Sequence, residues 1–354
     1  MTHFSPREQI REMSGYHSPQ VDVPVRLNTN ESPFPPPTDW VKSIGAIAES
    51  IDWNRYPDRA ATELCEAIAR RHGVAPEQVF VANGSNEVIQ TILLAYGGHG
   101  RIVATFEPTY QMYAQIAHVT GAEVVEGERR ADLTLDPIEI ERVVARHQPA
   151  VTFLCNPNNP TGLVEPRENL EALLEVASGI VVVDEAYAEF SDWSAMELVS
   201  EDKPIAVTRT FSKTLSMAAL RVGYVVGPTW LINDLRIAAL PYHLDSFKQA
   251  ATIAALQYTK EMEERVEFIK AQRARLEAEM RSLDLEVWTS GSNFVLFRSS
   301  AHDAKTLWSA VLAQGVLVRD CSSWPRLEGC LRVTVGTESE NTAFLAALRA
   351  SLPA

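Results

Sequence analysis

The stretch GIVVVDEAYAEF, residues 179–190, joins a short apolar run to a carboxylate, Asp184, at the point where the run ends. A continuous β-branched run of this length is typical of a strand that is buried on both faces. Similar runs recur along the chain, separated by longer amphipathic stretches, and this alternation predicts an α/β domain with a mainly parallel sheet. The predicted strands are 79–82, 102–106, 151–155, 180–184, 205–208 and 222–226.

The pattern changes after residues 240–246, where a long charged helix begins. Its apolar residues recur at helical spacing, and short strands follow at 294–297, 316–318 and 331–335. We expect an N-terminal arm over 1–29, a large domain over 30–250 and a smaller α+β domain over 251–354. The helices expected in the large domain are 62–71, 87–96, 137–147 and 167–177.

The composition argues against several classes of partner. With 46 acidic and 32 basic residues, the 354-residue chain carries a formal net charge of -14, which repels nucleic acid and anionic membranes. The first residues are polar, and no apolar run approaches the roughly 18 residues that a membrane span needs. The four cysteines lack any C-x-x-C spacing, which predicts neither a metal site nor a disulfide framework and favours a cytoplasmic location.

Polar residues follow several of the predicted strands, at the edge where ligands bind in open α/β sheets. Gly84, Ser85 and Asn86 open a helix whose free N–H groups favour a phosphate, although many helices begin this way. The turn NPNNPTG at 156–162 presents amide side chains, as an ordinary turn also does. Asp184 ends a buried strand, and a buried carboxylate costs several kcal/mol unless it is paired.

A single lysine, Lys213, stands among hydroxyls and small residues in VTRTFSKTLSMAALRVGY, residues 207–224, with Arg221 eight positions on. A lone lysine between a strand and a helix is usually a surface residue. The neighbouring motifs favour a different interpretation, because together they require one ligand with several distinct groups.

That ligand carries a phosphate for the glycine-opened helix and Arg221, and a protonated ring nitrogen for Asp184. It also carries a polar ring substituent for Asn159 and Tyr187, and an electrophilic carbon for Lys213. Pyridoxal 5'-phosphate (PLP) has all of these groups, and its chemistry uses a lysine and a carboxylate in these roles. The sequence therefore predicts a PLP enzyme.

The chain also resembles the fold-type I PLP-dependent aminotransferases, and within them the histidinol-phosphate aminotransferase family. The motifs that carry the resemblance occur in the family's order: LNTNESPFPPP, RYPD, GSNE, PTYQMY, NPNNPTG, VVVDEAYAEF, RTFSKTLSMAALRVGY and LRVTVGT. The resemblance implies an aspartate aminotransferase-like fold, and transamination in two half-reactions within histidine biosynthesis. This chain departs from the family's usual residues at Ser32, Asn86, Ser216 and Ala219.

The resemblance assigns roles to individual residues. Lys213 would bond covalently to PLP and act as the general acid and base, Asp184 would contact the pyridine nitrogen, and Tyr110 would stack on the ring. The ring hydroxyl would contact Tyr187 and Asn159. The phosphate would be held by Ser85, Asn86, Thr210, Ser212 and Arg221.

Substrate recognition involves a second set of residues. Arg332 resembles the family's carboxylate-binding arginine, and Arg319 would add a second guanidinium, which suits the phosphate of histidinol phosphate. The alternative for Arg319 is a surface ion pair with Asp320. Tyr16 matches a tyrosine of the arm that closes over the substrate. Tyr56, in NRYPD, matches a tyrosine that reaches the PLP phosphate of the other subunit, so a homodimer is expected. The alternative for Tyr56 is a turn tyrosine that packs locally.

Other functions remain open on the sequence. An aromatic amino acid aminotransferase would share every PLP residue and differ only in its side-chain selectivity. A decarboxylase of the cobalamin-pathway type also resembles this chain. A PLP-binding regulator would carry an additional basic DNA-binding segment, and the printed sequence shows no such segment before LNTNES.

Overall fold

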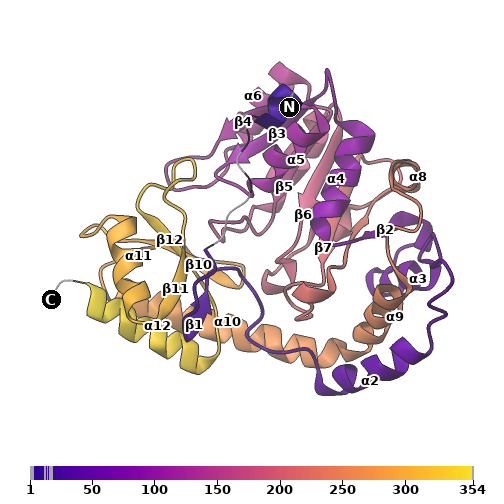
Figure 1. Ribbon diagram of the computed structural model, residues 1–354. Helices are drawn as coiled ribbons and strands as arrows, with labels where there is room; N and C mark the ends of the chain where they lie inside the picture. Colours follow the sequence, from indigo (N-terminus) through magenta and orange to yellow (C-terminus); the bar gives the residue numbers. More distant parts are fainter. Residues whose placement is uncertain (1–3, 12, 14, 16–18, 353–354) are drawn as a thin grey trace.

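The computed structural model describes residues 4–11, 13, 15 and 19–352, and two sheets organise them (Figure 1). The larger sheet consists of β2 (Val79–Ala82), β3 (Ile102–Glu107), β4 (Glu123–Glu128), β5 (Val151–Cys155), β6 (Ile180–Asp184), β7 (Ile205–Thr210) and β8 (Gly223–Val226). Its strand order is β2-β8-β7-β6-β5-β3-β4. The strand β8 runs opposite to the other six strands of this sheet, which are parallel to one another, so the prediction of a mainly parallel sheet is confirmed.

Helices cover both faces of this sheet. They are α3 (Thr62–His72), α4 (Ser85–Tyr96), α5 (Met112–Thr120), α6 (Pro137–His147), α7 (Arg167–Val176) and α8 (Thr229–Ala238). On β6, Val182 packs with α4, α5 and α8, whereas Val181 and Val183 pack with α6 and α7. Because both faces of the strand are buried, its sequence is apolar throughout rather than alternating.

The smaller sheet contains β1 (Val25–Leu27), β9 (Glu286–Val287), β10 (Phe294–Arg298), β11 (Val316–Asp320) and β12 (Cys330–Thr334). Its order is β1-β11-β12-β10-β9, and β1 runs parallel to β11. Residues 25–27, which the sequence places in an N-terminal arm, therefore complete a sheet otherwise built from residues 286–334. The domain boundaries themselves stay predictions.

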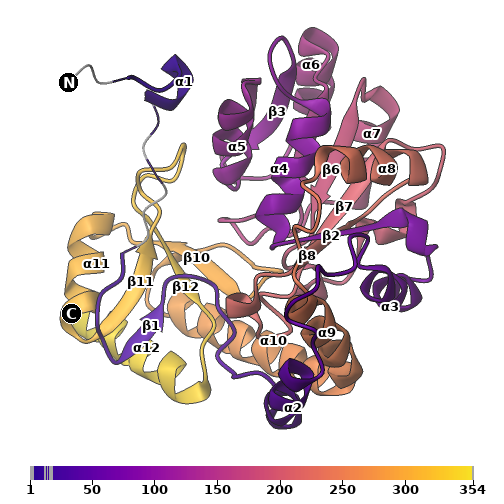
Figure 2. The same ribbon diagram turned by 45° about the vertical axis from the view of Figure 1, so that its right-hand side comes forward.

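The remaining helices flank or connect the two sheets. They are α1 (Glu8–Arg11), α2 (Thr38–Glu49), α9 (Ser246–Ala255), α10 (Thr259–Arg281), α11 (Ala304–Ala313) and α12 (Glu338–Ser351). Short 3-10 helices occupy Pro76–Gln78, Ala188–Phe190, Ala195–Leu198, Ala218–Leu220 and Leu256–Tyr258. The long helix α10 runs from the smaller sheet towards α9 (Figures 1 and 2). None of the described helices has the length and apolar character needed to cross a bilayer.

Candidate active site

A cavity of about 340 Å³ lies between the two sheets. Cys155, Asp184 and Thr208 are register partners near the carboxyl ends of β5, β6 and β7, the edge at which the cavity opens. All but two of the predicted site residues line the cavity: Ser85, Asn86, Tyr110, Asn159, Asp184, Tyr187, Thr210, Ser212, Lys213, Arg221, Arg319 and Arg332. The exceptions are Tyr56, which is 81% exposed, and Tyr16, which lies outside the described residues.

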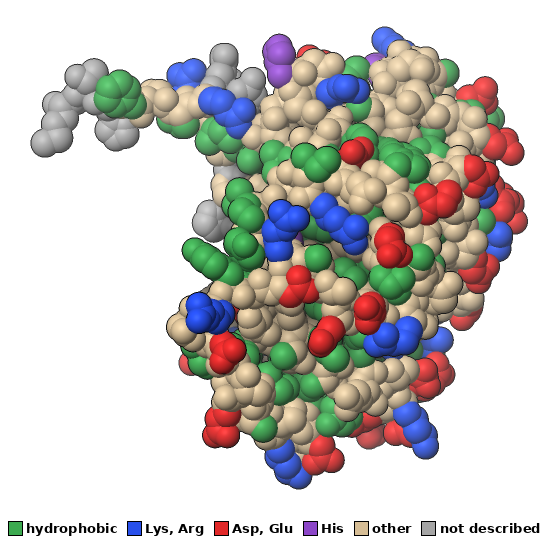
Figure 3. All heavy atoms as spheres, turned by 90° about the vertical axis from the view of Figure 1, so that its right-hand side faces the viewer, with side chains coloured by type: hydrophobic (Ala, Val, Ile, Leu, Met, Phe, Trp, Pro, Cys, Tyr) green, Lys and Arg blue, Asp and Glu red, His purple; other side chains and the backbone are tan. Residues whose placement is uncertain are grey.

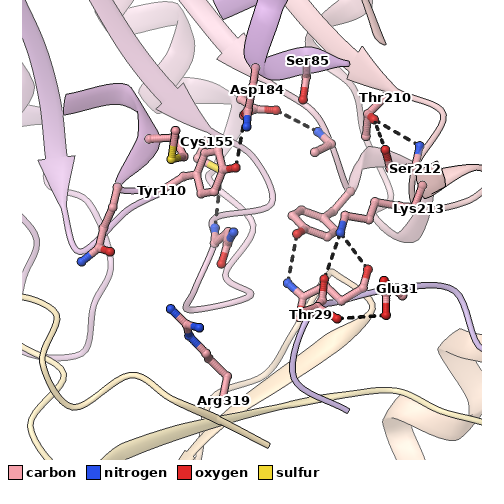
Figure 4. Close-up of a pocket in the computed structure, with 18 of the residues that line it drawn as sticks. Thr29, Glu31, Ser85, Tyr110, Cys155, Asp184, Thr210, Ser212, Lys213 and Arg319 are labelled. Atoms are coloured by element: carbon pink, nitrogen blue, oxygen red, sulfur yellow. Dashed lines mark hydrogen bonds between the residues drawn. The ribbon is translucent and has the colours of Figure 1, made fainter. Parts of the chain in front are cut away.

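The amine of Lys213 points towards the segment that carries Thr29 and Glu31 (Figure 4). Its Nζ donates to the carbonyl oxygen of Asn30 at 2.8 Å and to that of Thr29 at 3.2 Å. Burial, followed by the positive charge of Arg332, lowers the pKa of Lys213 to about 8. Much more of this lysine is therefore neutral near pH 7 than of an ordinary lysine, as a nucleophile or general base requires.

Asp184 is 3% exposed at the end of β6. Its Oδ2 accepts a hydrogen bond of 2.7 Å from the hydroxyl of Tyr113, and its Oδ1 accepts one of 3.1 Å from the N–H of Ala186. Burial raises the pKa of Asp184. These hydrogen bonds and the positive charge of Lys213 partly offset that rise. The carboxylate of Asp184 thus lines the cavity, where a cationic group of a bound ligand would stabilise its charged form.

Tyr110 was predicted from the motif PTYQMY, whereas Tyr113 in the same motif was not. Tyr113 is fully buried, and its ring stacks on Phe153 with the centroids 4.5 Å apart. Burial raises its pKa well above the ordinary value, so the hydroxyl keeps the proton that it donates to Asp184. Tyr110 precedes α5, so no helical spacing links the two tyrosines, and the contact of Tyr113 with Asp184, 71 residues away in the chain, leaves no signal in the sequence.

The residues predicted to hold the phosphate surround the start of α4. Gly84 precedes the helix with φ of 88°, and a Cβ there would lie 2.5 Å from Nη2 of Arg221. Nη1 of Arg221 donates to Ser212 Oγ at 3.2 Å, and Thr210 Oγ1 donates to the same oxygen at 3.0 Å. Hydroxyls, a guanidinium and a helix N-terminus therefore converge at one end of the cavity, as an anionic group requires.

Arg332 joins the smaller sheet to the carboxyl edge of the larger one. Its Nη1 donates to Asn159 Oδ1 at 2.5 Å, its Nη2 donates to the carbonyl of Asn28 at 3.2 Å, and its guanidinium lies 5.0 Å from the ring of Phe294. The predicted ring-hydroxyl ligand Asn159 is thus held by a predicted substrate ligand. The two sets of predicted residues form one continuous site.

Arg319 lies opposite Arg332, because the two are register partners on β11 and β12. It is 8% exposed and lines the cavity, with its guanidinium carbon 6.0 Å from the ring of Trp324. This placement argues against the surface ion pair with Asp320. Two guanidinium groups at one end of a cavity favour an anionic substrate.

The lining residues suit an organic phosphate that carries a cationic ring and a reactive carbonyl. Anion-binding groups at the start of α4, the carboxylate of Asp184 and the amine of Lys213 supply the matching contacts. The described residues contain no cluster of His, Cys, Asp or Glu side chains that could hold a metal ion. The residues therefore fit PLP.

Residues 22–348 match the family Aminotransferase class I and II, and the chain belongs to that family. The predicted family, enzyme class and PLP cofactor are thereby confirmed. Over 98% of its length, the chain is 44% identical to a histidinol-phosphate aminotransferase from Frankia casuarinae, of which it covers 90%.

Two solved structures show the same fold. The histidinol-phosphate aminotransferase from Sinorhizobium meliloti, in complex with pyridoxal-5'-phosphate, gives a TM-score of 0.88 at 23% identity, with 99% of this chain and 98% of that chain covered. The aspartate aminotransferase from Thermus thermophilus with maleate gives a TM-score of 0.84 at 24% identity, with 99% and 100% covered. The predicted aspartate aminotransferase-like fold is confirmed.

Proposed function

We propose that this aminotransferase acts on histidinol phosphate and 2-oxoglutarate, forming imidazole-acetol phosphate and glutamate in histidine biosynthesis. The observation that carries the proposal is the pair of buried arginines, Arg319 and Arg332, opposite each other on neighbouring strands. A phosphate dianion makes more charge-assisted hydrogen bonds with two guanidinium groups than a carboxylate does. The identity of 44% to a histidinol-phosphate aminotransferase supports the same substrate.

Bound PLP supplies an electron sink for the bond-breaking step. Ser85, Asn86, Thr210, Ser212 and Arg221 hold its phosphate, through hydroxyls, the N-terminus of α4 and a guanidinium.

Further residues hold and orient the cofactor ring. Asp184 keeps the ring nitrogen protonated, and Tyr113 orients that carboxylate through its hydrogen bond. Tyr187 and Asn159 would contact the ring hydroxyl, and Tyr110 would cover one face of the ring. Together these contacts hold the reacting carbon in a constant position relative to Lys213.

Lys213 performs the proton transfers. Its Nζ would hold PLP covalently in the resting enzyme. Its free amine would act as the general base that takes the proton from the substrate carbon bearing the amino group, and as the general acid that returns it. The lowered pKa of about 8 keeps enough of the amine neutral for this work.

The second candidate is an aromatic amino acid aminotransferase, which the aromatic ring of Trp324 beside Arg319 favours. Steady-state kinetics on wild type and on Arg319→Ala separate the two candidates. We expect kcat/KM for histidinol phosphate to exceed that for phenylalanine. Loss of Arg319 should lower kcat/KM for histidinol phosphate by about tenfold or more, because a hydrogen bond to a charged group contributes about 1.5–3 kcal/mol.

The matched control in that experiment is glutamate, which carries two carboxylates but no phosphate. Arg319→Ala should lower kcat/KM for glutamate much less than for histidinol phosphate. Equal losses for the two substrates, together with a preference of the wild type for phenylalanine, would reject histidinol phosphate in favour of the aromatic substrate.

We also propose that the enzyme is a homodimer in which Tyr56 reaches the PLP phosphate of the other subunit. Trp53, Tyr56, Ile237 and Leu240 are between 70% and 82% exposed, and the ring of Tyr56 stacks on Tyr242 at 4.6 Å. Figure 3 looks onto the side of the molecule that carries α3 and α8, where hydrophobic side chains lie between charged ones. Large exposed apolar side chains of this kind mark protein contacts.

We also propose a cytoplasmic location, because the free thiols of all four cysteines fit a reducing compartment.

A further inference from the structure

Asn30 combines a strained backbone with nearly complete burial. It follows β1, is 2% exposed and has a φ of 56°, in the left-handed region that asparagine tolerates better than most residues. Such a conformation persists only where the surroundings hold it. The contacts of Asn30 show what holds it.

Thr334, on β12, forms hydrogen bonds with both the backbone and the side chain of Asn30. The N–H of Asn30 donates to Thr334 Oγ1 at 2.9 Å, and that hydroxyl donates to Asn30 Oδ1 at 3.2 Å. The Nδ2 of Asn30 faces the cavity, where it donates to the hydroxyl oxygen of Tyr187 at 3.0 Å. The side chain of Asn30 therefore bridges Thr334 and Tyr187.

The backbone carbonyl oxygen of Asn30 accepts two hydrogen bonds. Lys213 Nζ lies 2.8 Å from this oxygen and Asn293 Nδ2 lies 3.1 Å from it. The left-handed backbone turns the carbonyl towards Lys213, while the side chain of the same residue reaches Tyr187. One residue therefore contacts two groups that, in the proposed function, touch the cofactor.

We propose that Asn30 is a positioning residue for transamination, whose carbonyl orients the amine of Lys213 and whose amide orients the hydroxyl of Tyr187. The inference rests on the proposed function, because it takes these two groups as the reactive lysine and the ligand of the ring hydroxyl. The Asn30 amide donates to the Tyr187 oxygen, so the hydroxyl proton of Tyr187 is free to point into the cavity. The N-terminal segment, through Asn30, aligns side chains that the larger sheet supplies.

Two substitutions separate the roles of backbone and side chain. Asn30→Gly favours the left-handed backbone and keeps the carbonyl for Lys213, but removes the contacts with Tyr187 and Thr334. Asn30→Asp keeps the size of the side chain and replaces the Nδ2 donor by an oxygen with negative charge. Asn169→Asp is the matched control, because Asn169 is a buried asparagine on α7 whose amide donates to Leu135.

The first readout is the pH dependence of Lys213 acetylation in cofactor-free protein, measured by peptide mass spectrometry. In Asn30→Asp the added negative charge should move the midpoint for Lys213 from about 8 to a higher pH. Asn30→Gly and Asn169→Asp should leave the midpoint near that of the wild type. An unchanged midpoint in Asn30→Asp, or one moved equally by Asn169→Asp, would overturn the placement of Asn30 beside the amine of Lys213, on which its positioning role depends.

The second readout is a double-mutant cycle with Tyr187→Phe, using the pH titration of cofactor absorbance in the loaded enzyme. If Asn30 acts through Tyr187, Asn30→Gly shifts this titration in the wild-type background and adds little to Tyr187→Phe. Shifts that add in full would overturn the contact with Tyr187. A failed substrate assay combined with the expected acetylation shift would reject the proposed substrate and leave the positioning role intact.

Discussion

Lys213 and its surroundings show how one residue acquires its chemistry from the fold. Its motif marks Lys213 in the sequence. The same set of motifs also predicted other residues that line the cavity, among them Asp184, Tyr110 and Arg332. Asn30 and Tyr113 could not be found in this way, because their roles depend on contacts with Thr334 and Asp184, which lie far away in the chain. Side-chain contacts between distant segments carry no local signal.

The pKa of Lys213 leads to a prediction for covalent attachment of PLP to cofactor-free protein. The neutral amine is the attacking form, and its pKa is lowered from 10.5 to about 8. The attachment rate should therefore rise with pH and level off above about 8. Stopped-flow absorbance over a pH series measures this rate. A rate that keeps rising up to the ordinary lysine pKa would show that the lysine is not perturbed.

The elements of the larger sheet could mostly be read from the sequence, and the reason is burial. The six predicted strands are present, each within two residues of its predicted ends, because their apolar runs are covered on both faces. The strand β4 was missed because it lies at the sheet edge and its sequence EVVEGE is charged and largely exposed. The strand β1 was missed because its three residues carry no pattern, and only pairing with β11 defines it.

A contact between two elements gives a prediction for stability. His72, in the last turn of α3, lies 2.8 Å from the hydroxyl of Tyr224 on β8, and burial lowers its pKa from 6.5 to about 4. Since the unfolded chain binds this proton more readily, stability should fall as the pH drops from 6.5 towards about 4.

Denaturant unfolding at several pH values tests this contact. His72→Gln keeps a polar partner for Tyr224 and has no imidazole to protonate, so its free energy of unfolding should fall less over this pH range than that of the wild type. Parallel pH profiles for the two proteins would show that His72 is not the group responsible.

The whole molecule brings together two sheets, and the site is complete only where they meet. The class of fold could be predicted from the alternation of strands and helices, whereas the contribution of residues 25–31 to the smaller sheet and to Lys213 could not. The proposed dimer extends this assembly to a second subunit. Tyr56, which is 81% exposed and does not line its own cavity, is the residue that tests it.

Mixed dimers of Tyr56→Phe and Lys213→Ala subunits provide that test. If Tyr56 acts across the interface, the mixed dimer contains one site with an intact Lys213 and an intact Tyr56 from the partner. PLP affinity at that site should equal that of the wild type, and should exceed that of the Tyr56→Phe homodimer. Affinity equal to that of the Tyr56→Phe homodimer, or an active enzyme that sediments as a monomer, would contradict a shared site.

The most direct test of the whole account is a single turnover without an amino acceptor. PLP-loaded wild-type protein is mixed with histidinol phosphate, and imidazole-acetol phosphate is quantified by mass spectrometry, with Lys213→Ala as the comparison. We expect about one product molecule per site in the wild type and essentially none in Lys213→Ala, because the lysine amine carries the proton between the two carbons. Equal product in both proteins, or none in the wild type while phenylalanine is converted, would contradict it.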